Sequence, residues 1–119
     1  MARLLTFISN RPDVGVRAIE MERRYLTARA KAGAPLGWGV GFYQSGEILL
    51  KRRPLDDRGE VDLAPITKDV RADVLLAHVR NGTIGAPRTE NTHPFRFRQW
   101  LFAQTGTVET FAALRGRIL

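Results

Sequence analysis

The chain has 119 residues, a formal net charge of +7, and 44% hydrophobic against 26% charged residues. This length allows one domain with a packed core, and the balance of apolar and charged residues excludes intrinsic disorder, collagen-like repeats and a coiled coil. The longest apolar runs, such as residues 74–77, are far shorter than the roughly 20 residues of a spanning helix, so we expect no membrane segment.

The chain contains no cysteine and only two histidines. Disulfides, thiolate zinc sites and a cysteine nucleophile are therefore excluded within this sequence, and we expect neither a metal site nor a cofactor. The first residues lack the pattern of a secretory signal, and we expect a cytoplasmic protein. Arginines and lysines are scattered among acidic residues, which favours compositional bias over a nucleic-acid-binding tail as the source of the positive charge.

The first half of the chain alternates strand and helix signals. A short apolar stretch at residues 3–8 predicts an opening strand. Apolar positions at helical spacing predict a helix over about residues 16–31. Residues 39–43 and 47–52 are joined by a loop short enough for a hairpin and predict an antiparallel pair. The polar segment 53–62, with its proline and glycine, predicts a surface loop.

The second half adds one buried strand and a long loop. Residues 63–69 predict a short helical piece, and residues 73–79, the most apolar run, predict a strand at the centre of a sheet, covered on both faces. A long irregular loop follows at residues 81–91. Residues 95–103 predict one further strand, and residues 108–117 predict a final helix. This order predicts an α+β fold with an antiparallel sheet.

Two segments on the predicted sheet carry residues suited to a site. Gly37-Trp38-Gly39 lets the backbone approach a neighbour closely, although Trp38 equally suits a core position at a strand entrance. His78-Val79-Arg80 ends the buried strand. There the arginine can pair bidentately with a carboxylate, which belongs either to a ligand or to a structural salt bridge.

Two further segments lie in predicted loops. The run Glu90-Asn91-Thr92-His93-Pro94-Phe95 suits either a ligand pocket or a hydrogen-bonded loop with a core histidine. Thr105-Gly106 forms a strand-to-helix turn whose free N–H groups suit an anion or a developing oxyanion, as any such turn does.

Taken together, these segments resemble class II glutamine amidotransferases of the N-terminal-nucleophile type, in their bacterial stand-alone branch. The resemblance covers nearly the whole chain, and its most specific part is the HxR and ENTHPF pair. It also includes Met1-Ala2-Arg3-Leu4-Leu5 and Phe102-Ala103-Gln104-Thr105-Gly106-Thr107-Val108. The resemblance implies an αββα sandwich of the N-terminal-nucleophile hydrolase type, of which residues 1–119 form the N-terminal portion, so we expect an incomplete domain.

The resemblance also implies a reaction and a set of residues. In the family, an amino-terminal cysteine attacks the side-chain amide of glutamine, ammonia leaves, and the thioester is hydrolysed. Arg80 matches the residue that holds the substrate's α-carboxylate, and Gly106 matches an oxyanion N–H. The implied substrate-binding residues are Arg80, Thr83, Asn91, His93 and Trp38.

Three positions depart from the family pattern. Ala2 stands at the nucleophile position, and its methyl group can neither ionise nor attack. Thr105 replaces the oxyanion asparagine, and the loss of one such donor costs about 10²–10³ in rate. Leu36 stands where relatives often carry aspartate. The two catalytic losses together favour a natural pseudoenzyme over a substitution made to trap substrate.

Three functions remain open from the sequence. The first is an inactive amidotransferase-like module that binds glutamine or a related amino acid. The second is an active amidotransferase in an altered, truncated form. The third is a basic nucleic-acid-binding module, supported only by the alternation at residues 95–98 and by the aromatic content. Because a sandwich must cover the inner faces of both sheets, we expect a homo-oligomer or completion by another polypeptide.

Overall fold

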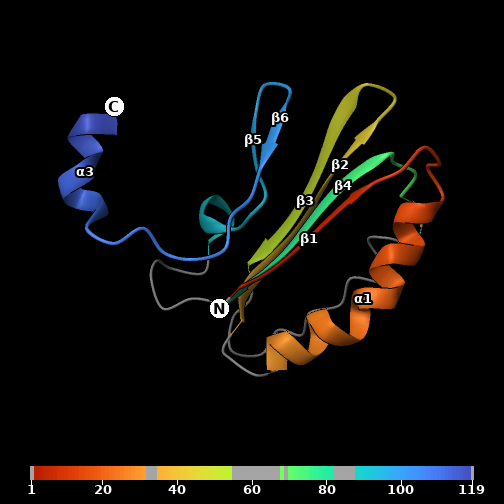
Figure 1. Ribbon diagram of the computed structural model, residues 1–119, viewed down its shortest axis with the longest axis horizontal. Helices are drawn as coiled ribbons and strands as arrows, with labels where there is room; N and C mark the ends of the chain where they lie inside the picture. Colours follow the sequence, from red (N-terminus) through yellow and green to blue (C-terminus); the bar gives the residue numbers. More distant parts are fainter. Residues whose placement is uncertain (1, 32–34, 55–67, 69, 82–87, 119) are drawn as a thin grey trace.

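The computed structural model describes residues 2–31, 35–54, 68, 70–81 and 88–118. These residues form a mixed α+β structure with a four-stranded antiparallel sheet, a separate two-stranded hairpin and two α-helices (Figure 1). The elements in chain order are β1 (Arg3–Ile8), α1 (Val14–Lys31), β2 (Pro35–Gln44), β3 (Glu47–Pro54), β4 (Val74–Asn81), the 3-10 helix η1 (Thr89–Asn91), β5 (Phe95–Phe97), β6 (Trp100–Phe102) and α3 (Phe111–Ile118).

The large sheet has the strand order β1-β4-β2-β3, and every neighbouring pair is antiparallel. The predicted central position of β4 is confirmed, since it pairs with β1 on one side and with β2 on the other. The predicted β2–β3 hairpin is also confirmed. Its turn residues Ser45 and Gly46 have φ angles of 51° and 78°, as the tightest hairpin turns require.

One face of the sheet packs against α1 and forms the hydrophobic core. Because successive strand residues point to opposite faces, Trp38, Val40 and Phe42 of β2 share this face. The buried cluster consists of Ile19, Trp38, Val40, Phe42, Val70, Ala72, Leu75, Ala77 and Val79. Figure 1 shows α1 running along this side of the sheet.

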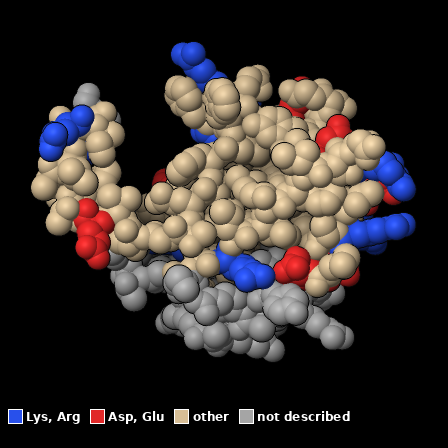
Figure 2. Space-filling view, in the orientation of Figure 1, with Lys and Arg blue, Asp and Glu red and all other residues tan. Residues whose placement is uncertain are grey.

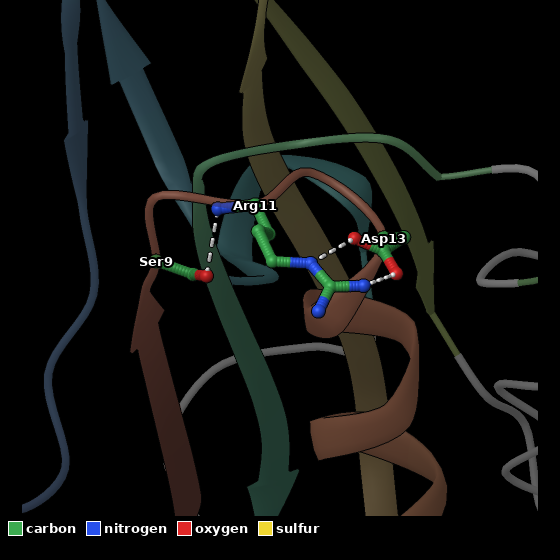
Figure 3. A network of polar contacts seen from close by, with 3 residues as sticks. All are labelled: Ser9, Arg11 and Asp13. Carbon is green, nitrogen blue, oxygen red and sulfur yellow. Dashed lines mark hydrogen bonds and ion pairs between the residues drawn. The ribbon is translucent and has the colours of Figure 1, made fainter.

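The turn between β1 and α1 is held by polar contacts (Figure 3). The backbone N–H of Arg11 donates to Ser9 Oγ at 3.0 Å, and the Arg11 guanidinium makes two contacts with Asp13, the shorter at 2.7 Å. This hydrogen-bonded guanidinium holds the pKa of Asp13 below its usual value. The turn thereby orients the chain so that α1 returns across the sheet.

The opposite face of β2 carries glycines at alternating positions, Gly37, Gly39 and Gly41. A Cβ at Gly39 would collide with the carbonyl oxygen of His93, and one at Gly41 would lie 2.9 Å from Leu101 Cδ1. The polypeptide from residue 92 to residue 101 therefore lies directly on this glycine face. Figure 1 shows the β5–β6 hairpin on the side of the sheet away from α1.

The prediction of one strand over residues 95–103 is wrong. The chain instead reverses at Arg98, whose φ is 51°, and β6 pairs with β5 so that Phe97 lies opposite Trp100. The sequence hides this turn because Arg98-Gln99 lacks the glycine or asparagine that usually marks a two-residue hairpin. Aromatic residues alternate within each arm, at positions 95 and 97 and then at positions 100 and 102, so each arm by itself resembles part of a strand.

Two helix boundaries also differ from the prediction. Helix α3 begins at Phe111 rather than at residue 108, because Thr110 has a left-handed φ of 55°. Helix α1 begins at Val14, two residues earlier than predicted. The predicted helix at 63–69, apart from Lys68, lies outside the described residues, as do residues 55–62 of the predicted surface loop and residues 82–87 of the later loop. Neither described helix has the length and apolar character needed to cross a membrane.

Candidate functional site

The start of β1 and Arg80 lie at the same end of the β1–β4 strand pair. In the β1–β4 register Arg3 pairs with Val79 and Leu4 with His78. Ala2 directly precedes Arg3 and Arg80 directly follows Val79, so both residues lie at the same end of this strand pair. His78 pairs with Gly39 and Arg80 with Gly37, and strand residues two apart share a face, so His78 and Arg80 belong to the glycine face of the sheet.

Two histidine rings are stacked on that face. The His78 and His93 ring centroids are 4.4 Å apart with an interplanar angle of 18°, and Phe95 packs against His93 at 4.3 Å between centroids. Both histidines contact the backbone of the same residue, Gln104. His78 Nε2 lies 2.9 Å from the carbonyl oxygen of Gln104, and the Gln104 N–H donates to His93 Nδ1 at 3.1 Å.

These contacts fix the tautomer of each neutral ring. A carbonyl oxygen only accepts hydrogen bonds, so His78 carries its hydrogen on Nε2 and donates it to Gln104. His93 accepts at Nδ1, so its hydrogen lies on Nε2. The Nδ1 of His78 is then a buried acceptor that makes no hydrogen bond to any part of the chain that the structure describes.

Burial favours the neutral form of both rings. His78 is only 2% exposed, and desolvation, followed by the nearby His93, lowers its pKa to about 4. Desolvation and the charge of Arg80 lower the pKa of His93. Arg80 itself is 9% exposed, and burial lowers its pKa as well.

The loop that presents His93 is anchored to β2 and β3. Thr92 is fully buried, and its Oγ1 donates to the Arg88 carbonyl oxygen at 2.8 Å. Arg52 of β3 donates to the Thr92 carbonyl oxygen at 3.4 Å. A Cβ at Gly37 would lie 3.0 Å from Thr92 Oγ1. Glycines on β2 therefore let this loop approach closely enough for His93 to reach His78.

The predicted site residues do not all share this face. Trp38 is 5% exposed and belongs to the core cluster on the α1 side. Its neighbours Gly37 and Gly39 face the other way, and there residues 92–94 approach the backbone of β2 closely. Asn91 is exposed at the end of η1. Thr105 and Gly106 are exposed and directly follow Gln104, and Gly106 has a left-handed φ of 104°. Thr83 lies outside the described residues.

Sequence reasoning missed two parts of this arrangement. The glycine stripe was visible as Gly-x-Gly-x-Gly at period two, a spacing that places all three glycines on one face. The role of Gln104 had no sequence signal, because it acts through its backbone. Among the described residues, no cluster of three His, Asp or Glu side chains has the arrangement of a metal site.

Figure 2 shows how charge is distributed on one face of the molecule. Lysines and arginines there stand among aspartates and glutamates around a broad uncharged area. Affinity for nucleic acid usually rests on a continuous run of positive charge, and this view contains none among the described residues.

Comparison with known proteins identifies the family. The chain matches the family model described as "Glutamine amidotransferases class-II" over residues 1–118, and it therefore belongs to this family, as its sequence motifs predicted. It is 34% identical over 101 residues to "Gamma-glutamyl-hercynylcysteine sulfoxide hydrolase" of Mycobacterium tuberculosis, covering 82% of this chain and 42% of that protein.

More distant relatives carry related names. The chain is 23% identical to "Probable glutamine amidotransferase DUG3" of Saccharomyces cerevisiae over 97% of its own length and 34% of that protein. It is 27% identical to "Putative glutamine amidotransferase YafJ" of Escherichia coli, covering 66% of this chain and 32% of that protein. The chain thus spans less than half the length of these relatives.

Proposed function

We propose that this protein is a catalytically silent amidotransferase-type module that binds glutamine or a related amino acid by its α-carboxylate. The observation that carries the proposal is the residue at position 2. This position directly precedes Arg3, which pairs with Val79 in the β1–β4 register, and it is an alanine. Its methyl group has no lone pair for attack on a carbonyl, whereas the family reaction begins with such an attack.

The other residues of the site suit binding better than catalysis. A buried guanidinium is well suited to a carboxylate, which it binds through two parallel charge-assisted hydrogen bonds. Thr83, Asn91 and His93 are proposed to line the same pocket. The Gly106 N–H is proposed to donate to the ligand's carbonyl oxygen, with Thr105 in place of a second amide donor. Trp38 is proposed to support the pocket from the core.

The proposed ligand is an amino acid with a γ-carbonyl group. Glutamine is the substrate of the family reaction, and the mycobacterial relative is named as a γ-glutamyl hydrolase. Glutamine and the compound in that relative's name both contain a γ-glutamyl group, and we propose that the α-carboxylate of this group binds Arg80. The proposed fold of the complete domain is the αββα sandwich, to which α1, the four-stranded sheet and the β5–β6 hairpin contribute.

The proposal is tested by measuring ammonia release and binding separately. Purified protein from which Met1 has been removed should release no ammonia from L-glutamine, yet should bind it in calorimetry. Replacing Arg80 with lysine keeps the charge but loses the planar fork, and binding should weaken about tenfold to a hundredfold. Arg117→Lys on the exposed surface of α3 is the matched control and should leave binding unchanged.

Three results would contradict this proposal. Ammonia release at the rate of an ordinary family member would show that the protein is an enzyme. Recovery of glutaminase activity in Ala2→Cys with Thr105→Asn would support instead an active amidotransferase in altered form. Absence of glutamine binding in the unaltered protein would remove the proposed ligand.

We also propose that the outer face of the β5–β6 hairpin is covered by protein, either in a homo-oligomer or by another polypeptide that completes the sandwich. Phe97, Trp100 and Phe102 are 70%, 73% and 56% exposed, and their register places them on one face of the hairpin. A contiguous aromatic face of this kind is typical of an interface. Helix α3 also exposes apolar side chains, including Phe111 and Ile118.

Tryptophan fluorescence tests this coverage. The chain has two tryptophans, so Trp38→Phe leaves Trp100 as the reporter. Its emission should move to shorter wavelength as protein concentration rises or as the completing polypeptide is added, with a matching increase in mass by light scattering. A monomer at high concentration, whose Trp100 emission stays that of an exposed indole even with the candidate polypeptide present, would refute the proposal.

A further inference from the structure

We propose that His78 and His93 are positioning residues that, as neutral imidazoles, hold the Gln104 backbone at its C=O and its N–H and so fix the place of the following Thr105-Gly106 segment. His78 lies on β4 and His93 on the loop before β5, so the two rings come from different parts of the chain. His78 donates one hydrogen bond to the carbonyl oxygen of Gln104, and His93 accepts one from the Gln104 N–H. We call this arrangement the histidine clamp.

Both histidines of the clamp are held in place by their surroundings. His78 sits in the central strand of the sheet, at a position paired with Gly39 and Leu4. His93 is held because its own backbone lies against Gly39 and its neighbour Thr92 is fully buried. Stacking of the two rings fixes their relative orientation. Gln104 is therefore positioned by two side chains that have little freedom to move.

Protonation affects the two rings differently. His93 accepts at Nδ1, so a proton there would replace the acceptor with a donor facing the Gln104 N–H. His78 already donates from Nε2, so its protonation would leave that bond in place. Its main effect would be to place a second buried cation beside His93 and Arg80. His93 is therefore the group whose protonation opens the clamp.

The surroundings favour the neutral, closed state. The charged or titratable groups that act on the pair are the two histidines themselves and Arg80 of β4. Arg52 of β3 reaches the same loop through the Thr92 carbonyl oxygen. Among the described residues no carboxylate contributes to the pKa of either histidine. We expect the clamp to be closed at neutral pH and to open below the usual histidine pKa.

The experiment is NMR on the unaltered protein, in which only two histidines contribute. At pH 7.5, ¹⁵N shifts should report Nε2–H tautomers for both rings. The hydrogen-exchange protection factor of the Gln104 amide should fall by about tenfold or more as His93 titrates, since about one hydrogen bond is lost. Amides of β4 should keep their protection over the same range. A protonated Nδ1 on His93 at pH 7.5 would overturn the proposal, as would a Gln104 amide with no dependence on this titration.

Variants separate positioning from packing. Asparagine places a carbonyl oxygen near the position of Nδ1, so His93→Asn should retain Gln104 protection to within about threefold and abolish its pH dependence. His93→Leu keeps an apolar side chain but has no acceptor, and should lose about tenfold in protection at every pH. Equal protection in the two variants would mean that His93 acts through packing alone. The titration of the unaltered protein decides the question if either variant fails to fold.

A link between the clamp and ligand binding rests on the proposed function, because Thr105-Gly106 is the segment proposed to meet the ligand's carbonyl oxygen. Glutamine affinity should then fall in parallel with Gln104 protection as the pH is lowered. If the exchange results hold and glutamine does not bind at any pH, the clamp stands and the proposed function fails. If glutamine binds without this pH dependence, the clamp does not position the ligand-binding segment.

Discussion

Replacing Gly39 with alanine should lower the free energy of unfolding by about 3 kcal/mol. A Cβ at this position would overlap the carbonyl oxygen of His93 and lie 2.9 Å from Pro94 Cδ. The first of these neighbours is backbone, which cannot rotate away. The loop that carries His93 would therefore have to lift from β2, and the stacked contact with His78 would be lost with it.

Chemical denaturation monitored by circular dichroism measures this change. Gly15→Ala is the matched control, because its Cβ would meet Phe7 Cδ1 at 3.5 Å, an ordinary contact, within helix α1. Alanine is the better helix former, so this control should lose no stability and should gain up to about 1 kcal/mol. If Gly39→Ala unfolds within about 0.5 kcal/mol of the unaltered protein, the close packing of the His93 loop on β2 is wrong.

Acidification should destabilise the protein through the two histidines, by on the order of 3 kcal/mol between pH 7 and pH 4. Burial lowers the pKa of His78 from 6.5 to about 4, so between these values the unfolded chain binds more protons than the folded one. Stability therefore rises with pH across this window. The contribution is fully present above about pH 6.5 and is lost as the pH falls toward 4. His93, whose pKa is also lowered, acts with the same sign.

Unfolding in denaturant at a series of pH values measures the slope. Since the chain has only two histidines, a variant with His78→Gln and His93→Asn should show a flat profile over the same window. Asp13 also has a pKa lowered from 3.8, so its contribution begins to be lost only at the acid end of this window, and it does so equally in the unaltered protein and in the variant. An unaltered protein whose stability is constant from pH 7 to pH 4.5 would contradict the burial of neutral histidines.

The sequence alone determined the family and most of the secondary structure. The motifs around Arg80 and His93 are local in the chain, and so are the hydrophobic periodicities that predicted β1, α1 and the β2–β3 hairpin. The match of Ala2 to the family's nucleophile position likewise needed only the first residues of the chain. Local patterns of this kind need no knowledge of which distant segments meet.

Only the tertiary structure decided how these segments come together. The sequence did not predict the turn at Arg98, because no residue pattern marks an arginine with a left-handed φ angle. The hairpin that contains this turn packs against Gly41 through Leu101, a contact between segments far apart in the chain. The histidine clamp was hidden for a different reason: it unites β4, the loop before β5 and the backbone of Gln104. A backbone N–H and C=O are identical in almost every residue, so no side-chain pattern marks the residue that two histidines hold.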